Sequence, residues 1–241
     1  MRHWALIALL PLAACGRGDR PSTAAGPPAG VSVAAAPAGT ATAPAAAPPV
    51  RADLAKRTGE LVNPSELQMV MLYHSLSGVP APLDKWTEDD GRVRYAQPQD
   101  RAARRAEVRA ELEAAARSVA NVGRLRLSTN LDGLPYDPTY GEFRVAAFAP
   151  SSSYGFKALG EEVKVGFANG QVAQIWRVPK ADAQAVMDRA GPYPNLVADA
   201  LLQIVDVQPE QAGGAISANV VEYELQTRDG KTTVGRVRVA P

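Results

Sequence analysis

The chain has 241 residues, with 26 Lys and Arg against 25 Asp and Glu and a formal net charge of +1. Charges this evenly balanced provide no extended basic surface, so we exclude nucleic acid as a partner. The single cysteine, Cys15, leaves no partner for an internal disulfide. The folded part must therefore be stabilised by its core.

The first residues have the pattern of a secretory signal. Arg2 supplies a positive charge, and Trp4–Leu12 is an apolar run of nine residues. This length suits a signal peptide and is far below the roughly 20 residues that span a bilayer. Ordinary signal-peptidase cleavage requires small residues in an A-x-A pattern, for which Leu12 is too large.

Leu12-Ala13-Ala14-Cys15 resembles the lipobox of bacterial lipoproteins. The resemblance implies that residues 1–14 are removed as a signal peptide and that Cys15 is acylated, with palmitate as a typical chain. Several acyl chains would hold the protein on the lipid bilayer, since each buried methylene contributes about 0.8 kcal/mol. Gly16 replaces the aspartate that retains such proteins at the inner membrane, which implies the periplasmic face of the outer membrane.

Residues 15–50 are predicted to be a disordered tether behind the lipidated cysteine. Between Gly16 and Val50 the chain has 12 alanines, seven prolines and five glycines, and no leucine, isoleucine or aromatic residue. Such a segment buries too little apolar surface to offset the entropy of ordering it. It is either a passive spacer or a segment that contacts peptidoglycan or a partner.

Residues 51–241 are predicted to form a single α+β domain, in which N-terminal helices precede a mainly antiparallel β-sheet with one inserted short helix. Asn63-Pro64-Ser65-Glu66 predicts the start of a helix, with Asn63 as its cap, and Gly78 predicts its end. The stretch 79–98 is rich in prolines and turn residues, so we expect it to be irregular. A second helix is expected over 99–120.

From Val122 onward, apolar residues recur with a period of two, which indicates half-buried strands. One such alternation covers 143–147. Asn169-Gly170 predicts a tight hairpin turn between strands at 163–167 and 172–178, because both residues tolerate positive φ. The other expected elements are a helix Lys180–Ala190, an apolar segment Leu196–Val207, and a hairpin of Ile216–Thr227 with Lys231–Val239 across Asp229-Gly230.

The search for catalytic residues gives no candidate, and neither a metal site nor a cofactor is predicted. After the signal peptide the only histidine is His74, which lies in the first, mainly apolar helix and is expected to be packed there. Ser151-Ser152-Ser153 lacks the glycine pattern of a nucleophile elbow. Paired carboxylates such as Glu161-Glu162 leave glycoside hydrolysis as an alternative.

Four aromatic residues flank the strand expected near Phe143. Tyr136 and Tyr140 precede it, and Tyr154 and Phe156 follow it. If they gather at its ends, they form a possible ligand or partner patch, because tyrosine combines an apolar body with a polar tip. Ordinary loop packing is the alternative.

Two stretches, Tyr136–Phe143 and Pro179–Ala185, resemble an uncharacterised family of bacterial domains. In that family an arginine-containing helix precedes a Tyr-Asp strand, and a short acidic helix comes later. The resemblance implies this order of elements and no activity.

We therefore expect a non-enzymatic lipoprotein of the bacterial cell envelope. Its partner would be another envelope component, either an envelope protein or peptidoglycan. The alternative is a periplasmic, carboxylate-dependent hydrolase acting on cell-wall material.

Overall fold

The computed structural model describes residues 48–192 and 194–239. The predicted signal peptide, Cys15 and the tether up to residue 47 lie outside this range. Within it, no helix is long and apolar enough to cross a membrane. The carbonyl oxygen of Pro48 already accepts a hydrogen bond from the Asn219 side-chain amide at 3.0 Å. Pro48, three residues ahead of the predicted domain start at Arg51, therefore contacts the domain.

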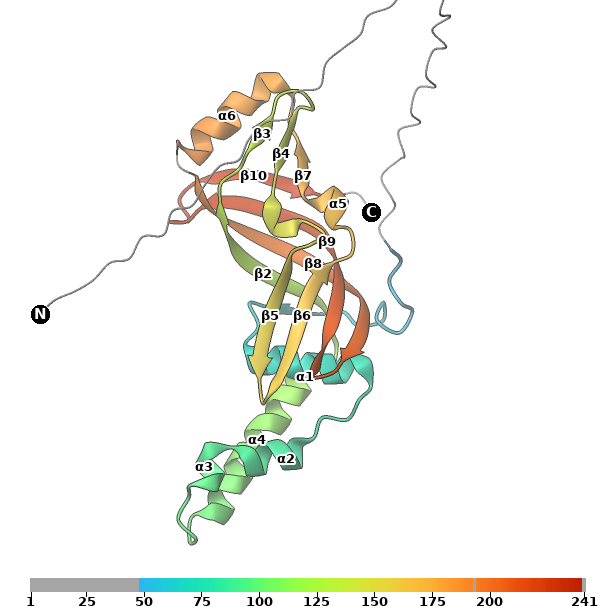
Figure 1. Cartoon of the computed structure of the whole chain (residues 1–241), viewed down its shortest axis with the longest axis vertical. Helices are drawn as coiled ribbons and strands as arrows, with labels where there is room; N and C mark the ends of the chain where they lie inside the picture. The colour runs from blue at the N-terminus through green and yellow to red at the C-terminus, as the bar shows by residue number, and fades with distance from the viewer. Residues whose placement is uncertain (1–47, 193, 240–241) are drawn as a thin grey trace, which may run out of the picture. The chain divides into compact units, whose positions relative to one another are not determined.

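A long twisted sheet forms the centre of the domain (Figure 1). Its strands run in the order β1-β2-β8-β9-β6-β5, and β10 pairs with β9. Most pairs are antiparallel, whereas β1–β2 and β6–β9 are parallel. Together with the helices, this sheet confirms the α+β class. The strands are β1 (Gly59–Val62), β2 (Val122–Asp132), β5 (Ser153–Ala158), β6 (Glu161–Phe167), β8 (Asn195–Glu210), β9 (Gly213–Thr227) and β10 (Thr233–Arg238).

The period-two pattern of the long strands separates a core face from an outer face. On β8, Leu196, Ala198 and Ala200 are buried, while Val197 and Asp199 alternate with them on the outer face. Helix α1 (Glu66–Ser77) packs against β5, β6, β8 and β9. The core is therefore made by the inner face of the sheet and by a helix that is apolar on nearly every side.

The hairpin predicted across Asp229-Gly230 is confirmed. β9 and β10 pair antiparallel on either side of this turn. Gly230 has a φ of 69°, which glycine adopts without strain. Asp229 accepts hydrogen bonds from the Thr227 hydroxyl and from the Lys231 amide, which fixes the turn.

The hairpin predicted across Asn169-Gly170 is wrong. β6 forms its hairpin with the preceding strand β5, across Leu159-Gly160, whose φ values of 56° and 80° suit a type I′ turn. Asn169 is buried instead and exchanges two 2.9 Å hydrogen bonds with the backbone of Val220 on β9. The Asn169 side chain thus joins the end of β6 to β9. The chain then continues into the short helix α5 (Gly170–Ala173) instead of turning back as a strand.

A small second sheet is formed by β3 (Tyr136–Asp137), β4 (Glu142–Arg144) and β7 (Ile175–Arg177), in the order β3-β4-β7. The alternation predicted over 143–147 stops at Arg144, because Ala146–Phe148 form a 3₁₀ turn that buries Phe148. The helix predicted after β7 is confirmed as α6 (Lys180–Ala190), ending at Gly191.

The N-cap of helix α1 lies two residues after the predicted cap, Asn63. Ser65 is the N-cap, and it forms a reciprocal capping box with Gln68. Asn63 instead has a positive φ of 42° and ends β1. The stop at Gly78, with a φ of 72°, is confirmed.

The stretch 79–98 is not irregular as predicted, because it holds two short helices, α2 (Leu83–Asp89) and α3 (Gly91–Arg94). Asp90 reads as a turn residue in the sequence, but its carboxylate caps α3 by accepting the Arg92 amide at 2.7 Å. The next predicted helix is confirmed as α4 (Arg101–Ser118). We call α2, α3 and α4 together the helical arm; α4 packs on α1.

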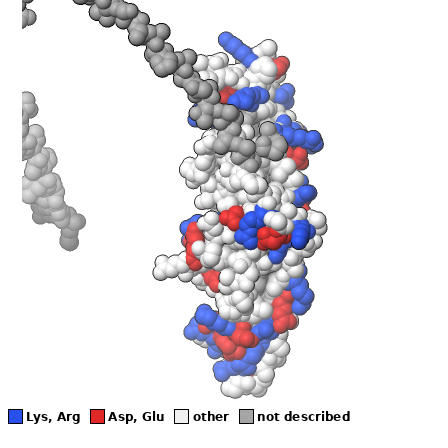
Figure 2. Space-filling view, turned by 90° about the vertical axis from the view of Figure 1, so that its right-hand side faces the viewer, with Lys and Arg blue, Asp and Glu red and all other residues white. Residues whose placement is uncertain are grey.

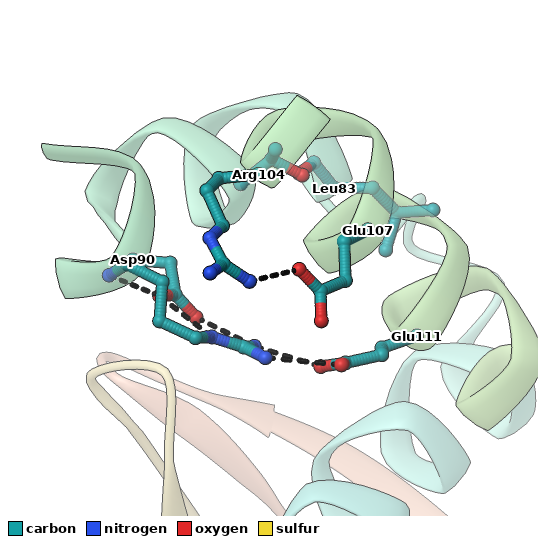
Figure 3. Close-up of polar contacts among 7 residues, drawn as sticks. Leu83, Asp90, Arg104, Glu107 and Glu111 are labelled. Carbon is teal, nitrogen blue, oxygen red and sulfur yellow. Dashed lines mark hydrogen bonds and ion pairs between the residues drawn. The ribbon is translucent and has the colours of Figure 1, made fainter. Parts of the chain in front are cut away.

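Ion pairs lie on the surface of the arm, and one of them, Arg92–Glu111, joins α3 to α4 (Figure 3). Arg92 contacts Asp90 at 3.1 Å and Glu111 at 2.7 Å, and Arg104 contacts Glu107 at 2.7 Å. Exposed pairs of this kind contribute little, typically about 0–1 kcal/mol each. The arm is therefore held mainly by its buried apolar residues, which are Trp86, Val93, Val108 and Leu112.

Candidate functional site

Two adjoining hollows lie between the second half of β2 and the edge strand β5. They have volumes of about 290 and 640 Å³, and Tyr154 lines both. We call them together the β2–β5 groove. The smaller hollow is lined by Asn63, Pro64, Leu127, Ser128, Tyr154, Gly155 and Phe156.

The groove exists because β1 is short. β1 pairs with β2 only as far as Arg126, opposite Val62. The Asn63 side chain then accepts the Ser128 amide at 2.9 Å, and its positive φ turns the chain away. Beyond Ser128, β1 therefore no longer covers the edge of β2.

Tyr154 and Phe156 lie on the same face of β5, two residues apart. The Tyr154 ring packs edge-on against Phe167, with 5.7 Å between ring centroids, and its hydroxyl donates to the Ala147 carbonyl at 3.3 Å. Burial raises the pKa of the Tyr154 hydroxyl, and a hydrogen bond with Thr129 partly offsets this rise. The ring is thus held in place along the groove.

Tyr136 and Tyr140 do not join this pair, since neither lines the β2–β5 groove. Tyr136 belongs to the small sheet, where its ring lies 4.7 Å from that of Phe143 and its hydroxyl donates to the Val178 carbonyl. Tyr140 is 72% exposed in the β3–β4 turn. The predicted gathering of four aromatic residues fails because β4 has only three residues before the chain turns.

A separate hollow, of about 580 Å³, lies over the outer face of the large sheet. Its side chains form ion pairs between strands: Arg126 donates to Asp199 at 2.8 Å, and Arg236 donates to Glu224 at 2.7 Å. Asp199 and Glu224 are direct partners in the β8–β9 register. Sequence reasoning missed this carboxylate pair because its members are 25 positions apart and become neighbours only through the strand register.

Of these two outer carboxylates, Glu224 is poorly suited to proton donation. Hydrogen bonds from Arg236 and then from Thr233 lower the pKa of Glu224, so it stays ionised near neutral pH. A general acid in glycoside hydrolysis instead needs a raised pKa. In the described part of the chain, no group of three or more His, Cys, Asp or Glu side chains is arranged to hold a metal ion.

Charges of both signs alternate over the visible surface, as Figure 2 shows, and no large area there carries one sign. This distribution agrees with the near-zero net charge of the chain. The face shown in Figure 2 therefore offers no surface of one sign for long-range electrostatic attraction.

Comparisons with protein families, with curated proteins and with solved structures found no match. The resemblance of Tyr136–Phe143 and Pro179–Ala185 to an uncharacterised bacterial family stays a prediction.

Proposed function

We propose that this protein is a non-enzymatic lipoprotein of the bacterial cell envelope, anchored through acylated Cys15 on the periplasmic face of the outer membrane. The observation that carries the proposal is Leu12-Ala13-Ala14-Cys15, preceded by a short apolar run and followed by an Ala- and Pro-rich segment. Acyl chains and a long linker suit a domain that acts close to a membrane.

We further propose that the domain binds another envelope component, a protein or peptidoglycan, through the β2–β5 groove. The groove supports this role because it combines apolar surface from Leu127, Tyr154 and Phe156 with polar groups of Asn63 and Ser128. Binding sites commonly place a few polar groups in such an apolar hollow. Aromatic side chains are also enriched where partners contribute most binding energy.

Site-specific photo-crosslinking in intact cells tests the groove. A benzophenone amino acid at Phe156 should give a crosslinked product of higher mass from the envelope fraction. The same amino acid at Tyr140, an exposed aromatic position outside the groove, should give none. Crosslinks from Tyr140 and none from Phe156 would place the contact elsewhere on the domain.

The alternative, a carboxylate-dependent hydrolase, has one supporting observation, which is the facing pair Asp199 and Glu224 in the outer hollow. The lowered pKa of Glu224 argues against it. Purified protein incubated with peptidoglycan tests this alternative: release of soluble fragments that the Glu224→Gln variant fails to release would favour the hydrolase.

A further inference from the structure

His74 lies where α1, the helical arm and the large sheet meet. Its side chain is 7% exposed. On one side the ring packs edge-on against Trp86 of α2, with centroids 5.3 Å apart. Its Nδ1 atom lies 3.0 Å from the carbonyl oxygen of Val79, in the connection to the arm, and its Nε2 atom lies 3.0 Å from Oε2 of Glu161 on β6.

Both ring nitrogens therefore face hydrogen-bond acceptors. A neutral imidazole carries one N–H, so it can donate to Val79 or to Glu161 but not to both. The doubly protonated ring donates to both. When one proton is lost, the remaining proton belongs on Nε2, because a bond to a carboxylate is roughly twice as strong as a bond to a neutral carbonyl. The unprotonated Nδ1 then faces the Val79 oxygen, and the bond to the arm is lost.

The charged groups on the surrounding elements are engaged elsewhere. Tyr73 of α1 meets the His74 ring edge-on at 5.1 Å. On β6, Glu162 pairs with Lys157 at 3.4 Å. Other pairs on the neighbouring elements include Asp84–Arg109, Lys85–Asp89, Glu88–Arg105, Arg109–Glu113 and Lys164–Glu210. Glu161 is thus the charged group in contact with the ring, and it is itself only 21% exposed.

We propose that His74 and Glu161 form a proton-dependent latch that fastens the start of the helical arm to the sheet. Histidine changes its charge between about pH 5 and 8. With both ring nitrogens protonated, the ring holds both Val79 and Glu161, and the latch is closed. When the ring loses one proton, the Val79 contact opens and the segment 78–89 loosens. An envelope protein with such a latch would change the freedom of its arm with external acidity.

Amide hydrogen exchange of the full-length protein tests the latch. After correction for intrinsic exchange rates, protection of amides in 78–89 should fall about fivefold between pH 5.5 and 8, as expected for the loss of one hydrogen bond. Amides of β9 serve as the internal reference. An unchanged or rising protection of 78–89 across this range would overturn the proposal.

Two variants and one control make the test specific. In Glu161→Gln the new side-chain amide can donate to Nε2 of the neutral ring. The ring proton then stays on Nδ1 and is donated to the Val79 carbonyl, so the fall in protection of 78–89 should disappear. His74→Gln lacks the imidazole ring, so its protection of 78–89 should also show no fall. Glu162→Gln changes the neighbouring carboxylate, which faces Lys157, and should keep the wild-type fall. An undiminished fall in either of the first two variants contradicts the latch.

Discussion

The contact between α1 and β9 makes a quantitative prediction for Gly214→Ala. Gly214 does not have a positive φ, so its backbone tolerates alanine. A methyl group there would lie 2.1 Å from Cε2 and 2.5 Å from Cδ2 of Tyr73. The Tyr73 ring is buried and meets His74 edge-on, so it has little room to move aside. Overpacking of this kind costs about 1–3 kcal/mol. At about 2–4 °C per kcal/mol for a domain of this size, we expect the melting temperature to fall by about 2–12 °C.

Thermal unfolding followed by circular dichroism measures this cost. Gly166→Ala on the neighbouring β6 is the matched control, because no atom lies within 4 Å of its added methyl group. Its melting temperature should stay close to that of the wild type. In a Tyr73→Leu background, the penalty of Gly214→Ala should largely vanish, which a double-mutant cycle would report as coupling. A Gly214→Ala protein as stable as the wild type would refute the described packing of α1 on β9.

Three further predictions concern stability. Asn169→Ala should lower the free energy of unfolding by about 2–4 kcal/mol in urea titrations, because it leaves the buried amide and carbonyl of Val220 unpaired; an effect below about 1 kcal/mol would contradict the role given to Asn169. A chain starting at Arg51 should melt lower than one starting at Pro48, since it loses the Pro48–Asn219 bond and the packing of Val50; equal melting temperatures would return the domain boundary to Arg51. The pKa of Glu224 lies below its ordinary value of 4.5, because Arg236 and Thr233 stabilise the carboxylate. Its contribution is therefore present above about pH 4.5 and is lost as the pH falls through the lower, folded-state pKa. Glu224→Gln should flatten the decline of melting temperature with acid, and an unaltered decline would show that this carboxylate is not involved.

The elements that could be predicted from the sequence are those whose signals are local. Helix α6 and the β9–β10 hairpin carry a periodic pattern together with their own stop or turn residues, and both lie where expected. The failures came where a residue with a strong local preference serves a distant contact. Asn169-Gly170 is a favourable turn pair, yet the Asn169 side chain is taken by Val220, 51 positions away. The turn that does occur, Leu159-Gly160, has an apolar residue at a position of positive φ, which no local rule favours.

Only some residues of the candidate site could be predicted from the sequence. Tyr154 and Phe156 were singled out because they follow the strand expected near Phe143, and the structure places both on one face of β5. Their neighbours Leu127 and Ser128 lie on β2, which approaches them only through the curvature of the sheet. The His74–Glu161 pair is separated by 87 positions and follows from how α1 docks. Such contacts depend on tertiary packing, for which a single sequence carries no local signal.

Acylation of Cys15 is the most direct test of the central proposal. Cells expressing the full-length chain are labelled with a palmitate analogue, and the N-terminal peptide is weighed by mass spectrometry. The account predicts a labelled protein whose N-terminus is an acylated Cys15 and which fractionates with membranes. In Cys15→Ser the label should be absent, and the protein should be unprocessed or soluble. A Cys15→Ser protein that still carries the label, or a wild-type N-terminus without acyl chains, would contradict the lipoprotein assignment.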